Sequence, residues 1–489
     1  MATRIVAPPK KAIVSNLRLL ARQLNSVPST FPAAVSGQFA ASEPSPAANT
    51  GKPSPLIDLT DPERLFSSVP TSKLIRSAAN LHAAAVAPVM DLGIRVMKSK
   101  LIMGTGLARD AVLGAVRRTF YDHFCGGEDT VEAAAAVRRL NEAGLRGMLD
   151  YAVEDVEDNS SCDRNLEAFL HTVESTKTLP QGYVSFVIVK ITAICPIHLL
   201  RRVSDLLRWQ KKNPSFSLPR NHYSFPILSD STPLYHTPEE PQLLTPEEEA
   251  DLFLAQERLR RIGSRCEQYN IPLCIDAEYT AVQPAIDFFT YSAAMEHNRN
   301  GPIIYGTLQA YLKDAKERLL LKSEAARKMG ISIGVKLVRG AYMSSETKLA
   351  HSLGYESPIH NSIQETHDCF NDCAAFMLEK IDSGSGAVVL ATHNVESGQL
   401  AAAKAKDMGI CGNHRLEFAQ LYGMADSFSF GLRNAGFQVS KYMPFGPVDQ
   451  VMPYLLRRAE ENRGLLSAST LDRQLIRNEL WRRLRASIL

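Results

Sequence analysis

A cationic segment near the C-terminal end of the chain has residue types and spacing suited to binding a small anion. Tyr442 lies in a short β-type run, and the helical segment after it carries Tyr454, Arg457, Arg458 and Glu461 at positions i, i+3, i+4 and i+7. This spacing puts those four side chains on one helix face. Two guanidinium groups beside an aromatic ring and a carboxylate form a clamp for a planar carboxylate, which bidentate hydrogen bonds hold in one orientation. The alternative is a solvated basic helix end with an internal Arg–Glu pair.

Several apolar runs elsewhere in the chain finish in polar residues. Taken singly, each is best explained as a strand end that meets water. Gathered at one rim of a sheet, the set is better explained by a bound ligand, because buried polar groups are costly without partners. The polar ends are Lys190 and Thr192, Asp276 and Glu278, Gln309, Arg339, and Thr392, His393 and Asn394.

Eight β-type runs alternate with helical patterns and must position these side chains. They cover 147–154, 185–192, 272–278, 303–309, 333–340, 387–394, 416–423 and 438–446. The alternation predicts a parallel sheet, and eight units in one domain predict closure into a (βα)8 barrel of the α/β class with helices outside. The polar strand ends would then meet at the C-terminal rim, where barrel active sites lie. An open doubly wound sheet is the structural alternative.

The rest of the chain divides around this predicted barrel, residues 146–489. Residues 56–145 have helical apolar spacing and predict an N-terminal helical region, which begins with Asp61 as an N-cap. An insertion at about 197–268 is longer than a βα unit needs. Its last helix starts with a capping box formed by Thr245 and Glu248. The insertion is a surface elaboration, a lid or a partner surface, and the sequence does not choose among them.

The first 45 residues differ in composition from the remainder. Residues 1–42 hold five basic and no acidic residues, so the other residues carry 50 basic against 52 acidic ones, a net charge of −2. An acid-free, Ser-containing, amphipathic start without a continuous apolar core predicts a transit peptide followed by a linker, with a disordered basic tail as the alternative. These residues do not separate a mitochondrial from a chloroplast signal. The nearly neutral body argues against nucleic-acid binding.

The cysteines and the apolar runs limit two further classes of site. The eight cysteines form no C-x-x-C pair, which indicates reduced thiols. His367, Cys369 and Cys373 have metal-like spacing but lie in a helical pattern without a second ligand pair, so no metal site is expected. Since no apolar run reaches about 18 residues, any membrane contact is peripheral. The basic amphipathic segment 471–485 could lie on an anionic membrane or dock on the barrel.

Seven motifs together resemble the proline dehydrogenase family. They are VKITA, IDAE, TLQAY, KLVRGAY, ATHN, the Leu-Tyr-Gly of QLYGM, and Y(x14)RRAEEN, in the family's order from about residue 57 to the C-terminus. The long insertion and the transit-like start make the sequence similar to plant members. The resemblance implies a distorted (βα)8 barrel that binds FAD non-covalently at its C-terminal rim. The absence of a G-x-G-x-x-G fingerprint does not count against FAD, because this family does not use a dinucleotide-binding fold for it.

The resemblance also implies roles for individual residues. Arg457, Arg458 and Lys190 resemble the clamp for the proline carboxylate, and Tyr442 resembles the aromatic residue that packs on the proline ring and is oriented by Asp276. Tyr454 and Leu421 match further pocket walls, Glu461 matches a carboxylate that pairs with the clamp, and Asp276 and Lys336 match the positions nearest the chemistry. The residues that match FAD contacts are Gln309, Lys336, Val338, Arg339, Gly340, Ala341, Thr392, His393 and Asn394.

Lys336 departs from the pattern of many bacterial relatives, which have arginine near the flavin N5 atom. A lysine keeps the positive charge but not the planar fork, so N5 would be contacted differently. Tyr442 favours unsubstituted proline, since relatives that prefer hydroxyproline tend to carry a smaller residue there.

The implied function is the oxidation of L-proline to pyrroline-5-carboxylate, with ubiquinone as electron acceptor. The implied location is the mitochondrion, on the matrix side or at the inner membrane. Two alternatives remain open on the residues alone. One is a Schiff-base aldolase that uses Lys190 or Lys336, and the other is a barrel scaffold without catalysis.

Overall fold

A computed structural model describes residues 56–99, 104, 106–216, 225–464 and 466–488. The predicted transit peptide lies outside the described residues. So does the side chain of Glu461, although its backbone belongs to a helix.

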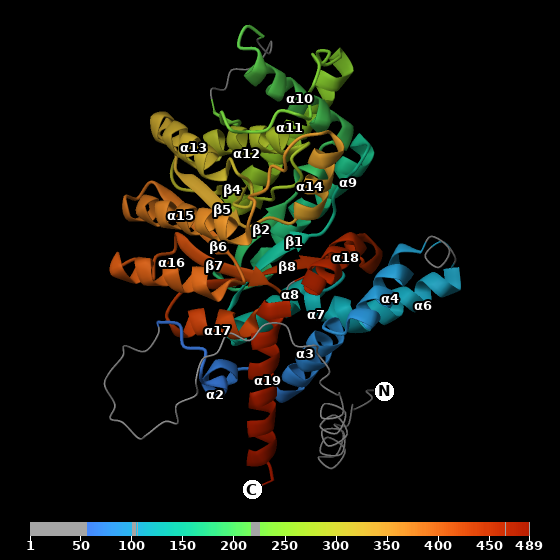
Figure 1. Ribbon diagram of the computed structural model, residues 1–489, viewed down its shortest axis with the longest axis vertical. Helices are drawn as coiled ribbons and strands as arrows, with labels where there is room; N and C mark the ends of the chain where they lie inside the picture. The colour runs from blue at the N-terminus through green and yellow to red at the C-terminus, as the bar shows by residue number, and fades with distance from the viewer. Residues whose placement is uncertain (1–55, 100–103, 105, 217–224, 465, 489) are drawn as a thin grey trace. The chain divides into compact units, whose positions relative to one another are not determined.

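Eight parallel strands close into a barrel in chain order, with β1 paired to β8 (Figure 1). This confirms the predicted fold class and excludes the open doubly wound sheet. Each predicted run overlaps one strand. The strands are β1 (Arg146–Tyr151), β2 (Val184–Val189), β3 (Leu273–Ile275), β4 (Ile304–Gln309), β5 (Ile333–Val338), β6 (Gly386–Ala391), β7 (Leu416–Leu421) and β8 (Val439–Phe445).

Helices follow the strands on the outside of the barrel. They are α9 (Asn159–Ser175), α10 (Ile197–Lys212), α11 (Pro246–Gln268), α12 (Gln283–His297), α13 (Ala315–Met329), α14 (Met343–Ser352), α15 (Ile363–Asp382), α16 (Val395–Asp407), α17 (Asp426–Asn434) and α18 (Val448–Gly464). Helices α10 and α11 form the two ends of the insertion. The predicted capping box at the start of α11 is confirmed, because Thr245 and Glu248 exchange both hydrogen bonds.

Helical segments also precede the barrel. They are α2 (Pro62–Phe66), α3 (Thr71–Ala84), α4 (Ala87–Lys98), α6 (Gly106–Val116), the π-helical turn η1 (Arg117–Tyr121), α7 (Asp122–Phe124) and α8 (Thr130–Glu142). The predicted N-cap is confirmed, since the Asp61 carboxylate accepts a hydrogen bond from the backbone of Arg64 at the start of α2.

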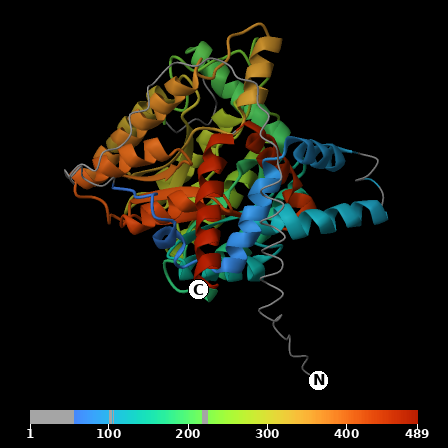
Figure 2. The same ribbon diagram turned by 60° about the horizontal axis from the view of Figure 1, so that its bottom comes forward.

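The last helix, α19 (Leu466–Ala486), packs beside α2 and α3 (Figures 1 and 2). Leu475 and Ile476 of this helix are buried. The Arg483 guanidinium donates to the carbonyl oxygens of Phe66 and Val69 at 2.7 and 2.8 Å. One face of this basic helix is therefore docked on the body of the protein.

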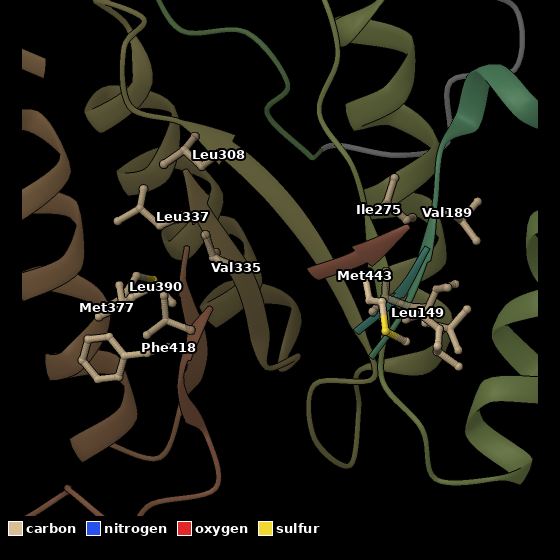
Figure 3. Packing of buried hydrophobic residues seen from close by; sticks show 14 of the residues in the cluster. Leu149, Val189, Ile275, Leu308, Val335, Leu337, Met377, Leu390, Phe418 and Met443 are labelled. Carbon is tan, nitrogen blue, oxygen red and sulfur yellow. The ribbon is translucent and has the colours of Figure 1, made fainter. Parts of the chain in front are cut away.

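The strands bury side chains on both of their faces. Outward-facing residues such as Leu149, Leu337 and Phe418 pack under the helices (Figure 3). A separate cluster fills the barrel interior and includes Met148, Ile188 and Cys274. Because side chains alternate along a strand, the residues two positions later face the same interior, one layer closer to the C-terminal rim. Those residues are Asp150, Lys190 and Asp276.

Candidate active site

Two lysines, two aspartates and a tyrosine form a buried polar set at the top of this interior. The Lys190 ammonium lies 3.4 Å from the Asp150 carboxyl group and 3.5 Å from that of Asp276. Lys336 binds the other oxygen of Asp276, and its ammonium lies 5.0 Å from the centre of the Tyr442 ring. The Tyr442 hydroxyl lies 2.7 Å from Asp150 and 2.8 Å from Asp276. Asp150, Lys336 and Tyr442 lie in β1, β5 and β8, and Lys190 and Asp276 directly follow β2 and β3.

The hydroxyl of Tyr442 carries one proton and cannot donate to both carboxyl groups. The second contact is satisfied if that carboxyl group is itself protonated and donates to the tyrosine oxygen. Burial raises the pKa of Asp150 and outweighs the opposing effect of Lys190. Burial would also raise the pKa of Asp276, but Lys336 and Lys190 hold it below its usual value. We therefore assign the proton to Asp150 and the negative charge to Asp276.

Both lysines keep their charge in this environment. Burial alone would lower the pKa of Lys190, but the neighbouring carboxylates, that of Asp276 among them, raise it above its usual value. Burial acts in the same direction on Lys336, and Asp276 again raises the pKa. The set therefore presents two cations against one charged carboxylate, an excess of positive charge that suits an anionic ligand.

The two arginines predicted as a clamp differ in their surroundings. Arg457 is half-buried and makes a bidentate ion pair with Glu154, from the loop after β1, at 2.5 and 3.0 Å. Arg458 is buried, and its guanidinium lies 5.2 Å from the centre of the Tyr454 ring. The side chain of Glu461, which was predicted to pair with the clamp, is not among the described ones. Glu154 is a partner of Arg457 that was not predicted from the sequence.

A second polar network joins the rims of β5 and β6. The Arg339 guanidinium donates to Thr392 at 2.6 Å, to Ser397 at 2.8 Å and to His367 at 3.1 Å. Asn394 caps α16 by accepting a hydrogen bond from the backbone of Ser397. Burial lowers the pKa of Arg339 to about 10, which still leaves it charged at neutral pH. Arg339, Thr392 and Asn394, which were predicted to contact the cofactor, thus lie together.

The remaining predicted contacts lie around the same rim. The side-chain amide of Gln309 donates to the carbonyl oxygen of Glu278 at 3.2 Å. His393 accepts a hydrogen bond from the backbone of Leu421 at 3.0 Å, and burial lowers the pKa of this histidine to about 3. Val338 ends β5 and is half-buried, while Gly340 and Ala341 are exposed.

Gly340 has a backbone conformation that favours glycine. Its φ is +138°, and a Cβ atom there would lie 1.8 Å from the ring of Tyr311. A side chain could therefore not be accommodated without moving the ring or the rim loop.

Glu278 is a buried carboxyl group behind this rim. It accepts hydrogen bonds from the Thr192 hydroxyl at 2.9 and 3.0 Å. Burial raises its pKa to about 8, so it holds a proton at neutral pH. Both residues were predicted only as polar strand ends.

Asp150 and Glu154 are site residues that were not predicted from the sequence. Both lie in the first predicted strand segment, GMLDYAVE, where each is a single acid among apolar residues. The signal in the sequence was the alternation of side chains along a strand. Asp150 follows Met148 by two positions, as Lys190 follows Ile188. Alternation alone would have pointed Asp150 into the barrel.

The three residues with metal-like spacing, His367, Cys369 and Cys373, make other contacts. His367 accepts from Arg339, and the Cys369 and Cys373 thiols hydrogen-bond each other. Among the residues that the structure describes, no group of His, Cys, Asp and Glu could hold a metal ion. The described helices also include none that is both long and apolar enough to cross a bilayer.

The fold and the site define a (βα)8-barrel protein with an excess of buried positive charge at the C-terminal rim. A family model described as proline dehydrogenase matches residues 133–470, more than half of the chain. The chain therefore belongs to the proline dehydrogenase family.

Two relatives from Arabidopsis thaliana resemble the chain over most of its length. Proline dehydrogenase 2, mitochondrial, is 58% identical over 440 residues, which cover 89% of this chain and 92% of the relative. Proline dehydrogenase 1, mitochondrial, is 57% identical over 437 residues, which cover 88% and 87%.

A solved structure shares the fold. Proline utilization A from Bdellovibrio bacteriovorus superimposes with a TM-score of 0.61 at 18% identity. The match covers 82% of this chain and 41% of that one, so this chain spans less than half of the bacterial protein.

Proposed function

We propose that this chain oxidises L-proline to pyrroline-5-carboxylate with bound FAD and passes the electrons to ubiquinone. Family membership supports the reaction, and the buried set of Lys190, Asp276, Lys336 and Tyr442 is the observation that carries it. We further propose a mitochondrial location, on the matrix side or in peripheral contact with the inner membrane. The names of the Arabidopsis relatives support the organelle.

The cations of the site bind and orient the substrate. Arg458, Arg457 and Lys190 would hold the proline carboxylate, because guanidinium and ammonium groups are its natural partners. Arg457 is already bound to Glu154, so the substrate competes with that carboxylate for the guanidinium. Tyr442 would pack on the ring, and its hydroxyl is fixed by Asp150 and Asp276. Such fixed positioning supplies much of the rate enhancement in reactions of this type.

The same cations act on the amine of proline. Hydride leaves carbon 5 most readily when the nitrogen is unprotonated, since its lone pair then forms the imine. Lys190 and Lys336 keep their charge and so disfavour a third cation beside them. The substrate nitrogen is thereby held neutral. No side chain is required as a general base.

The rim residues provide a donor set that suits FAD. Charged Arg339, the amide of Gln309 and the polar side chains of Thr392 and Asn394 offer hydrogen bonds, and exposed Gly340 allows close approach to the backbone. Lys336, His393, Val338 and Ala341 complete the proposed contacts. When bound, FAD supplies the acceptor for two electrons. Lys336 is bound to Asp276, so its ammonium group would have to contact that carboxylate and the cofactor at the same time.

The aldolase alternative is disfavoured by the state of the lysines. A Schiff base forms from a neutral amine, which barrel aldolases obtain by lowering the pKa of the lysine. Here the neighbouring carboxylates, that of Asp276 among them, raise the pKa of Lys190, and Asp276 raises that of Lys336.

The test is a visible spectrum of the purified protein, followed by L-proline without oxygen. We expect flavin bands that bleach with proline and return with a ubiquinone analogue. A flavin spectrum that does not change when proline is added would contradict proline as the substrate. A protein that stays colourless with added FAD would refute the cofactor and favour the aldolase or the scaffold.

A further inference from the structure

Helix α14 is attached to the body of the protein through few buried residues. Of its ten residues, Glu346 and Ala350 are buried, and the others are half-buried or exposed. The helix begins shortly after Gly340 and Ala341, the rim residues proposed to contact FAD. Because a buried carboxylate is costly without hydrogen-bond donors, the partners of Glu346 decide how this helix and the loop before it are held.

Both hydrogen bonds that the described residues donate to the Glu346 carboxylate come from Thr280. The backbone N–H of Thr280 donates to one oxygen at 2.6 Å, and its hydroxyl donates to the other. Thr280 lies in the loop after β3, four residues beyond Asp276. The contact between Thr280 and Glu346 therefore joins the loop that carries Asp276 to the helix that follows the proposed cofactor loop.

Thr280 is itself held by α10 and the insertion. Its carbonyl oxygen accepts a hydrogen bond from the guanidinium of Arg208 at 2.5 Å, and Arg208 is only 1% exposed. Nε2 of His236, in the insertion, lies 2.7 Å from the Thr280 hydroxyl oxygen. The N–H, the carbonyl and the hydroxyl of Thr280 thus each have a partner. The insertion helps to fix the loop after β3 and, through Glu346, the start of α14.

Stability alone does not explain why a carboxylate anchors α14. An apolar residue at this position would avoid the cost of burying a charged group. Apolar contacts, however, have no direction, whereas hydrogen bonds constrain both distance and angle. A carboxylate that receives two hydrogen bonds from one residue suits a pair of loops whose relative position matters.

We propose that Thr280 and Glu346 are positioning residues that hold the loop after β3 and the loop after β5 at one separation. The inference rests on the proposed function, in which proline binds beside Asp276 of the first loop and FAD contacts Gly340 and Ala341 of the second. Hydride transfer requires substrate and cofactor to meet in one geometry, and a displacement of about 1 Å can lower a rate by about 100-fold. Neither positioning residue is proposed to touch the substrate or the cofactor.

The first test is the rate at which proline reduces the flavin of Thr280→Val without oxygen. This change removes the hydroxyl and keeps the backbone N–H. We expect the rate at saturating proline to fall by about 10- to 100-fold. The Kd for proline, taken from the concentration dependence of that rate, should change little, because Lys190, Arg457 and Arg458 are unaltered. Thr280→Ser keeps a hydroxyl and should restore the rate.

A second readout does not depend on activity. The Kd for FAD can be measured from flavin fluorescence as the flavin-bound protein is diluted. Thr280→Val should raise this Kd by about 3- to 10-fold, the range of one hydrogen bond, because the cofactor loop loses an anchor. A purely structural role would lower Tm without changing the reduction rate of the folded, flavin-bound protein.

Thr232 provides a matched control in the insertion. Like Thr280 it is half-buried, and its hydroxyl donates to a carboxylate, that of Asp314, at 2.6 Å. Asp314 lies at the start of α13 and belongs to neither loop. Thr232→Val should therefore lower Tm by a similar amount and leave both the reduction rate and the Kd for FAD unchanged.

Glu346→Gln tests the same contact from the other side and keeps one acceptor oxygen. The double variant with Thr280→Val should reduce its flavin no more slowly than the slower single variant, because both changes remove one shared contact. Additive losses, unchanged rates in both single variants, or an equal effect of Thr232→Val would overturn the proposal. A wild-type flavin that proline does not reduce would instead contradict the proposed function. Even then, equal FAD dissociation constants for the wild type and Thr280→Val would overturn the positioning role.

Discussion

The two aspartates of the buried set should respond differently to replacement by asparagine. Tyr442 contacts both, but its single proton leaves one of them to carry a proton of its own, and we assign that proton to Asp150. Asp150→Asn would replace a neutral carboxyl group by a neutral amide of the same shape. Asp276→Asn would remove the charged partner that Lys336 and Lys190 share.

The expected difference follows from the cost of an unpaired buried charge. Removing one partner of a buried ion pair costs about 3–5 kcal/mol. A folded unit of roughly 430 residues has an unfolding entropy of about 0.9 kcal/mol/K, so Asp276→Asn should lower Tm by about 3–6 °C. Asp150→Asn changes one hydrogen bond and should cost about 1 kcal/mol, or about 1 °C.

Thermal unfolding of both variants as a function of pH is the assay. The pKa of Asp276 is lowered, so its stabilisation is present above the unfolded value of about 3.9 and is lost as pH falls through the folded pKa. The pKa of Asp150 is raised, so its stabilisation is full below the unfolded value and is lost as pH rises through the folded pKa. Asp150→Asn should therefore gain on the wild type as pH rises. If Asp150→Asn were the more damaging variant at neutral pH, the assigned protonation states would be wrong.

Three further predictions concern the clamp, the buried acid and the rim. Arg458→Met should lower kcat/KM for proline by about 10- to 150-fold, the range for hydrogen bonds to charged groups, and unchanged kinetics would exclude the clamp. The pKa of Glu278 is raised to about 8, so its stabilisation is full below about 4.3 and is lost as pH rises toward 8. Glu278→Gln should remove that loss from the pH dependence of Tm, and an unchanged profile would contradict the assignment. Gly340→Ala should reduce flavin content, measured by absorbance, because its Cβ would meet the Tyr311 ring, whereas Gly354→Ala, at a φ of +77° and in open space, should not.

The barrel was predictable because each strand has a recognisable pattern in its own local sequence. A short β-type run, a helical pattern and a polar strand end recur eight times, and right-handed βα units that repeat in this way close into a barrel. The boundaries differ by a few residues at the C-terminal ends. There the polar residues leave the sheet ladder to join the site, as Asp276 does directly after the three residues of β3.

The site was less predictable because its partners come from distant segments. The two arginines of the clamp share one helix, so their spacing revealed them, but the pair of Arg457 with Glu154 joins residues 303 positions apart. Asp150 was not predicted because a single acidic residue in an apolar run does not by itself indicate a site. The protonation of the set depends on distances among five strands, which no local pattern encodes.

The position of the buried set indicates that it serves ligand binding. Replacing a buried ion pair by apolar residues of similar volume is often neutral or stabilising, so stability alone does not explain two lysines and two aspartates inside a barrel. The layer immediately below them is apolar, with Met148, Ile188 and Cys274, which shows that these strands accommodate an apolar interior. The charged residues begin only at the layer that faces the rim. A substrate carboxylate that restores charge balance there offsets part of the cost of burying the cations, and the protein should accordingly gain more stability from proline than from pyrrolidine, which lacks the carboxylate.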